Sequence, residues 1–132
     1  MGKCLIDGEM ILAVDFDGTI STEPDMGEEL VLQPNCKRVL TKLSDDGIKL
    51  ILWTCRTGDA LEEALDFLES ENLLHVFTTI NDQLPEVNEK YAPDVARKVG
   101  ADFYIDDKNL MFKVDWNQIE SFLYGEGVEK SA

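Results

Sequence analysis

The sequence predicts an α/β fold in which helices cover both faces of a mainly parallel sheet. Short apolar runs of strand length alternate with segments whose apolar residues recur at helical spacing, a pattern typical of βαβ units. Right-handed crossovers between such units build a parallel sheet inside a three-layer fold. At 132 residues, 44% of them hydrophobic, the chain has the length of one domain. Because the sequence shows no internal repeat and no linker, we expect residues 1–132 to form a single domain.

Four apolar runs have the length and composition of buried strands. They are residues 10–16, 48–53, 76–80 and 102–105. The first breaks at Asp17-Gly18, and the last runs directly into Asp106-Asp107. Because the runs are mostly apolar, we expect each strand to be covered on both faces.

Four helices are expected between and after these strands, each with an apolar stripe and a start signal. The expected start signals are Asn35, Asp59, Pro93 and Asp115. Gly47 and Gly100 are expected to end the first and third helices. Residues 21–34, rich in acidic residues, glycine and proline, are expected to form a loop, and residues 124–132 a frayed tail.

The charge and the cysteines limit the partners and the compartment. The formal net charge is -15, so we expect neither nucleic acid nor anionic membranes as partners. A small phosphorylated substrate remains compatible, because a bound cation reverses the field locally. The three cysteines show no paired spacing, and no apolar run reaches the ~18 residues of a membrane span. We therefore expect a cytoplasmic protein with reduced thiols.

Carboxylates follow two of the expected strands. Asp15 and Asp17 lie in the run DFDGT at the end of the first strand, and Asp106-Asp107 follows the last. Grouped carboxylates in an apolar setting are costly unless a cation compensates them. If both strand ends lie side by side in a parallel sheet, three or four carboxylates converge. Mg²⁺ prefers such oxygen ligands, so we expect it as cofactor.

A hydroxyl and two cations accompany this acidic site. Thr54 and Arg56 follow the second strand, and Lys90 precedes the third expected helix. A transferred phosphoryl group needs such donors, because its charge spreads over its equatorial oxygens in the transition state. Together with the metal site, these residues predict phosphoryl transfer.

In this order the residues resemble the four motifs of phosphatases of the haloacid dehalogenase (HAD) superfamily. The resemblance covers residues 10 to about 110 and is carried by the DFDGT run, Thr54, Lys90 and Asp106-Asp107. It implies a Rossmann-like HAD fold and a Mg²⁺-dependent phosphatase. The gaps between motifs are 54 − 19 = 35 and 90 − 54 = 36 positions, which leaves no room for a cap domain.

The resemblance also implies roles for single residues. Asp15 attacks phosphorus and forms an aspartyl-phosphate, and Asp17 acts as general acid and base. The implied metal ligands are Asp15, Asp17 through its backbone carbonyl, Asp107 and Asp106, and which member of the last pair binds directly is open. The expected phosphate-binding residues are Gly18, Thr19, Thr54, Arg56 and Lys90. Lys98 competes with Lys90, which we prefer because Lys98 falls in the last turn of the expected helix.

Several alternatives remain open at this stage. Arg56 could pair with a nearby acidic residue instead of phosphate. The chain could be an inactive metal- and phosphate-binding regulatory module of the same fold. A receiver-like phosphoacceptor is disfavoured, because there the acidic pair comes first and the acceptor aspartate mid-chain. We expect the substrate to be a small phosphorylated molecule or a phosphorylated macromolecule. Without a cap domain, specificity must come from residues 20–34, from a partner subunit in a homo-oligomer, or from a large substrate that covers the site.

Overall fold

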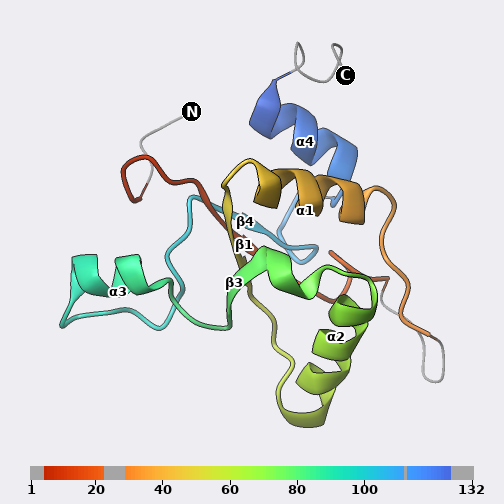
Figure 1. Cartoon of the computed structure of the whole chain (residues 1–132), viewed down its shortest axis with the longest axis horizontal. Helices are drawn as coiled ribbons and strands as arrows, with labels where there is room; N and C mark the ends of the chain where they lie inside the picture. Colours follow the sequence, from red (N-terminus) through yellow and green to blue (C-terminus); the bar gives the residue numbers. More distant parts are fainter. Residues whose placement is uncertain (1–4, 23–28, 112, 126–132) are drawn as a thin grey trace.

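The computed structural model describes residues 5–22, 29–111 and 113–125, which form the α/β fold that the sequence predicts (Figure 1). In chain order the elements are β1 (Ile11–Val14), α1 (Cys36–Asp45), β2 (Lys49–Leu52), α2 (Gly58–Ser70), the 3-10 helix η1 (Leu74–Val76), β3 (Phe77–Ile80), α3 (Pro85–Tyr91), β4 (Phe103–Ile105) and α4 (Trp116–Tyr124). None of the described helices is long and apolar enough to cross a membrane.

The sheet is parallel and has the strand order β3-β2-β1-β4. The central strand β1 pairs on both sides, so that Ala13 lies opposite Ile51 of β2 and Tyr104 of β4. The first two crossovers move the chain away from β1, and the third returns it to the other side of β1. In open α/β sheets, ligands bind at such a reversal, beyond the carboxyl ends of the strands. Here the reversal lies between β1 and β4.

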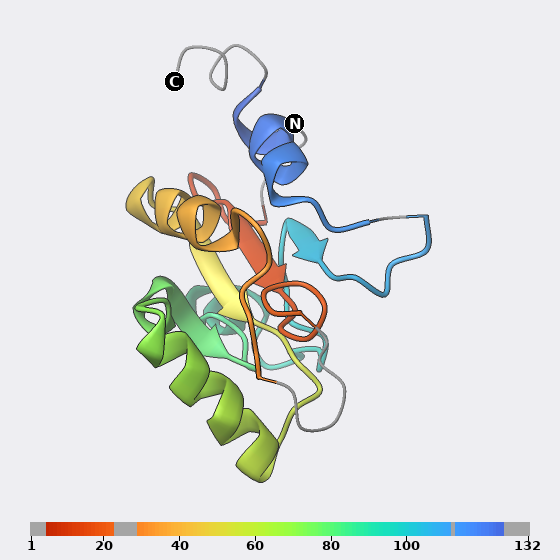
Figure 2. The same ribbon diagram turned by 90° about the vertical axis from the view of Figure 1, so that its right-hand side faces the viewer.

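Alternate residues of β1 feed two buried clusters on opposite faces of the sheet. Leu12 and Val14 belong to a cluster that α1, α2 and α4 complete, and Ile11 and Ala13 to a smaller one with Val87 of α3. Figure 1 shows α1 and α4 beside each other above the strands, and Figure 2 shows them together from the side. This layering confirms the expected three-layer fold, and the described residues show no cap domain between the expected motifs.

The third helix lies elsewhere than the sequence predicts. It runs from Pro85 to Tyr91, and no helix follows Pro93 in the described part of the chain before α4. Pro85 supplies the fixed φ of a first turn, and Val87 on this helix is buried. Pro93 then cannot continue the helix because it lacks an N–H, and the residue before it is held extended. Ala92 has ψ 145° accordingly, and the expected helix ending at Gly100 is wrong.

The other helix boundaries are close to those expected. Helix α2 begins at Gly58 with Thr57 at its N-cap, so Asp59 lies in the first turn instead of capping it. Asp115 does cap α4, because its carboxylate accepts hydrogen bonds from the N–H groups of Asn117 and Gln118. Tyr124 is part of α4 and not of a frayed tail. Residues 126–132 lie outside the described residues.

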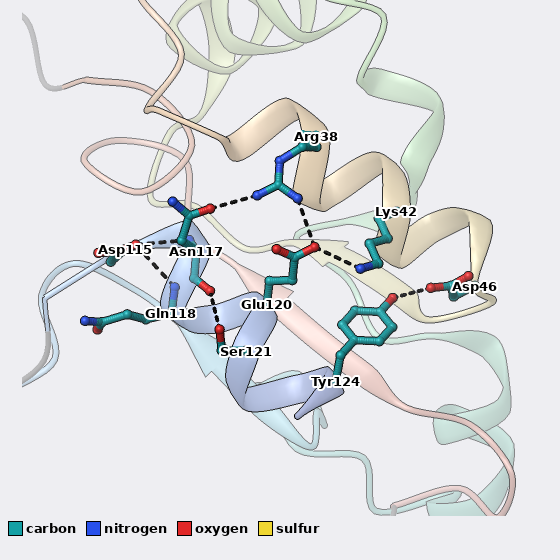
Figure 3. A network of polar contacts seen from close by, with 9 residues as sticks. All are labelled: Arg38, Lys42, Asp46, Asp115, Asn117, Gln118, Glu120, Ser121 and Tyr124. Atoms are coloured by element: carbon teal, nitrogen blue, oxygen red, sulfur yellow. Dashed lines mark hydrogen bonds and ion pairs between the residues drawn. The ribbon is translucent and has the colours of Figure 1, made fainter. Parts of the chain in front are cut away.

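A polar network joins α1 to α4 (Figure 3). The Glu120 carboxylate, whose side chain is only 6% exposed, pairs with Arg38 Nη1 and Lys42 Nζ, both at 2.9 Å. Arg38 also donates to the Asn117 side chain at 2.7 Å. These two cations, Arg38 first, hold the pKa of Glu120 below its usual value. A lowered folded-state pKa contributes stability above the unfolded-state pKa, and this is lost as the pH falls through the folded-state value.

We expect Glu120→Gln to lower the free energy of unfolding by about 1–2 kcal/mol near neutral pH, since two charge-assisted hydrogen bonds weaken. The difference from wild type should shrink as the pH falls below about 4. Urea unfolding at several pH values measures both effects. Glu69→Gln, at an exposed position of α2, is the matched control, and an equal loss in both variants would refute a role for the network.

Candidate functional site

Three carboxylates meet beyond the carboxyl ends of β1 and β4. Asp15 directly follows β1, and its N–H donates to the carbonyl of Ile105 at 2.9 Å. This bond fixes the start of the loop after β1 to the last residue of β4. Carboxylate oxygens of Asp15, Asp106 and Asp107 lie within 4.8 Å of one another. The convergence expected from the sequence therefore occurs.

Thr19 ties the two loops together. Its hydroxyl donates to Asp15 Oδ2 at 3.3 Å and accepts from the N–H of Asp107 at 3.0 Å. Its carbonyl accepts from the indole of Trp116 at 2.9 Å. Thr19 is fully buried, so its side chain joins the carboxylates instead of facing a phosphate as we expected.

Gly18 is required by both its backbone and its surroundings. Its φ is +77°, a conformation that L side chains rarely adopt, and a Cβ built on it would lie 2.1 Å from Asp107 Oδ2. Only a residue without a side chain lets Asp107 approach the turn this closely.

The cluster has the electrostatic character of a cation site. Burial, and then the neighbouring charge of Asp106, raise the pKa of Asp15 to about 7. Asp107 Oδ1 is buried and has no hydrogen-bond partner among the described residues. A buried, unpaired carboxylate oxygen is costly unless something cationic faces it. Three carboxylates at this spacing, one of them with an unpaired buried oxygen, fit a hard divalent cation such as Mg²⁺.

Asp17 belongs to a different arrangement, in which Arg56 holds its side chain. Arg56 Nε donates to Asp17 Oδ2 at 2.9 Å and Nη2 to Oδ1 at 2.8 Å, a bidentate ion pair. The third nitrogen, Nη1, donates at 2.8 Å to the Ala60 carbonyl and at 2.8 Å to Glu63 Oε1. The Arg56 guanidinium therefore pairs with acidic residues, the alternative left open by the sequence, and is not open to bind phosphate bidentately.

Thr54 follows β2 on the other side of β1. The N–H of the preceding residue, Trp53, donates to the Val14 carbonyl at 2.9 Å, which places this loop beside the end of β1. The N–H of Thr54 donates to Asn81 Oδ1 at 2.8 Å, and its hydroxyl accepts from the N–H of Arg56 at 3.2 Å. Asn81 holds this loop and was missed by the sequence analysis. The signal was a polar residue directly after a strand.

Lys90 lies at the amino ends of β1 and β4, opposite the carboxylates. Its Nζ donates to the Leu5 carbonyl at 2.5 Å, and the Leu5 N–H donates to Asp102, which directly precedes β4. A four-residue strand is about 13 Å long, and this length separates the amino ends of the strands from the carboxylates at their carboxyl ends. The preference for Lys90 rested on a helix starting at Pro93 and is wrong. The Nζ of Lys98 instead lies 4.6 Å from the centroid of the Tyr104 ring. Tyr104 belongs to β4, the strand that leads to Asp106.

The two described ends of the segment expected as a loop after the first motif pair with each other. The Thr22 N–H donates to the Val31 carbonyl at 2.7 Å, and the Gln33 N–H to the Ile20 carbonyl at 2.8 Å. The Gln33 side-chain amide also donates to the carbonyl of Gly18 at 3.3 Å. These paired ends are thus fixed to the turn that follows Asp15. Residues 23–28 lie outside the described residues.

The fold is similar to those of solved structures. No family model matches the sequence, and no curated protein matches it. An uncharacterized protein from Listeria monocytogenes serotype 4b is 23% identical, with a TM-score of 0.46 over 54% of this chain and 45% of that chain. A conserved protein from Bacteroides thetaiotaomicron is 31% identical, with a TM-score of 0.71 over 89% of this chain and 91% of that chain. The chain therefore belongs to the same family as this conserved Bacteroides protein.

Proposed function

We propose that this protein is a Mg²⁺-dependent phosphatase of the HAD type, which hydrolyses a phosphate monoester through an aspartyl-phosphate on Asp15. The observation that carries the proposal is the meeting of Asp15, Asp106 and Asp107 at the strand-order reversal, with a buried and unpaired oxygen on Asp107 among the described residues. The DFDGT run on β1 and the aspartate pair after β4 supply the resemblance to that superfamily.

The chain's own residues account for each proton and bond in two steps. A carboxylate oxygen of Asp15 attacks phosphorus, the bond from phosphorus to the leaving oxygen breaks, and Asp17 gives that oxygen a proton. Asp17 then takes a proton from water, which attacks phosphorus, and the bond to Asp15 breaks to release inorganic phosphate. The N–H groups of the turn at Gly18 and the hydroxyl of Thr54 are the candidate donors to the phosphoryl oxygens.

Asp15, Asp106 and Asp107 would hold the Mg²⁺ ion. When bound, the ion neutralises charge on the phosphoryl oxygens and orients the group for attack. The raised pKa of Asp15, caused first by burial and then by the charge of Asp106, fits a site that a cation would complete. Release of phosphate from an aryl phosphate with Mg²⁺, and its loss with chelator, is the direct test of the proposed function. Inactivity across a broad panel of phosphate esters would contradict it.

Metal binding can be tested without activity. We expect about 10 mM Mg²⁺ to raise the melting temperature by about 3 °C or more compared with NaCl of equal ionic strength, because a ligand that binds the folded state stabilises it. Asp107→Asn should abolish most of this shift. Asp66→Asn, the same charge change at an exposed position of α2, should keep it. Equal shifts in both variants would show that Mg²⁺ binds elsewhere.

A further inference from the structure

The side chain of Arg56 has almost no capacity left for a ligand. A guanidinium carries five N–H donors, and four of them are used by Asp17, Ala60 and Glu63. The Arg56 side chain is only 15% exposed, and its guanidinium carbon lies 5.1 Å from the ring centroid of Phe16. Phe16 is fully buried. The guanidinium is therefore fixed on one side by the core and on the other by α2.

The contacts on Asp17 are directional. Both carboxylate oxygens accept from Arg56 at 2.8 to 2.9 Å, which fixes the plane of the carboxylate as well as its position. Each oxygen keeps a second lone pair for another donor. The carboxylate that takes a proton from water in the second step of the proposed reaction is therefore held in one position and one orientation.

From this geometry we infer that Arg56 is a positioning residue, which holds Asp17 for the hydrolysis of the aspartyl-phosphate, and that Glu63 positions Arg56 in turn. The inference rests on the proposed function. Arg56 makes no contact with the phosphoryl group in this assignment. It acts through Asp17, so its loss should slow breakdown of the intermediate more than its formation.

Burst kinetics with 4-nitrophenyl phosphate separate the two steps. The nitrophenolate leaves without a proton, so formation of the intermediate does not depend on Asp17. We expect Arg56→Gln to lower kcat about 10- to 100-fold and to give a burst of about one nitrophenolate per enzyme. Asp17→Asn should give the same burst. The double variant should be no slower than Asp17→Asn, because Arg56 acts only through that carboxylate.

Further variants cover the case in which Arg56→Gln does not fold. Arg56→Lys keeps the positive charge but not the planar, bidentate guanidinium. Its burst amplitude should lie between those of wild type and Arg56→Gln. Added guanidinium should speed turnover of Arg56→Ala. Glu63→Ala should slow kcat about 3- to 10-fold with a burst, and Glu62→Ala, on the adjacent exposed position of α2, should behave as wild type.

The outcomes separate this inference from the proposed function. A raised KM without a burst, or a loss that adds to that of Asp17→Asn, would make Arg56 a phosphate ligand and overturn the inference alone. Wild-type protein that releases no phosphate with Mg²⁺ would overturn both.

Discussion

Asp15→Asn is expected to lower Mg²⁺-dependent phosphate release by about 10⁴-fold or more, because the amide cannot attack phosphorus. The measurement is kcat for an aryl phosphate at saturating Mg²⁺. Asp66→Asn, with the same loss of charge on the exposed face of α2, should retain wild-type activity. Retained activity in Asp15→Asn would remove the nucleophile from the proposed mechanism.

Asp15→Asn should also be folded, and without metal it should have a larger free energy of unfolding than wild type at about pH 8. The pKa of Asp15 is raised from 3.8 to about 7. Its contribution to stability is therefore full below the unfolded-state pKa and is lost as the pH rises through about 7. Asparagine does not ionise and avoids this loss, which we expect to be roughly 1–2 kcal/mol after solvent screening. Urea unfolding in chelator measures it, and a less stable variant would contradict the interpretation of the cluster.

Gly18→Ala is expected to lower activity at least about 100-fold, because the new methyl group displaces Asp107. The Cβ would meet Asp107 Oδ2 at 2.1 Å and its Cγ at 2.6 Å, so the carboxylate must leave its place beside Asp15. The positive φ adds a backbone cost of about 1–3 kcal/mol. Activity, the melting temperature, and the shift caused by Mg²⁺ should all fall.

Gly47→Ala separates the two causes. Gly47 has φ +85°, and among the described residues nothing lies within 4 Å of the place that a Cβ would take. This variant should incur the backbone cost and keep both activity and the response to Mg²⁺. If the two alanine variants lose activity equally, the close approach of Asp107 to Gly18 has no functional role.

The strands and the carboxylate cluster could be predicted because both depend on short-range patterns and one rule of topology. A short apolar run such as residues 48–53, directly preceded by Gly47, indicates a buried strand from its length and its flanking turn residue alone. Parallel strands bring their carboxyl ends to one edge, so Asp15 and Asp107 could be expected together without knowing any side-chain contact. The strand order itself, with β4 beside β1, came only from the structure.

The errors arose where a tertiary contact decides. Pro85 and Pro93 are equivalent helix starts by local rules, and burial of Val87 rather than the exposed Val95 separates them. That error carried Lys90 into the predicted site. From the sequence, Arg56 could bind phosphate or pair with an acidic residue equally well, because its partner Asp17 lies 39 positions away. Asn81 directly follows a strand but was missed, because its target is the backbone N–H of Thr54, which only the fold brings near it.

The hydroxyl of Thr19 and the N–H of Asp107 are joined across 88 positions of sequence. A ribosome-bound chain therefore carries Asp15 long before Asp106 and Asp107, and the carboxylate cluster cannot exist until β4 has emerged and docked on β1. Under the proposed function, any fragment that stops before β4 should release no phosphate, however well its helices form. Completion of the sheet and assembly of the three-carboxylate cluster are, for this protein, one event.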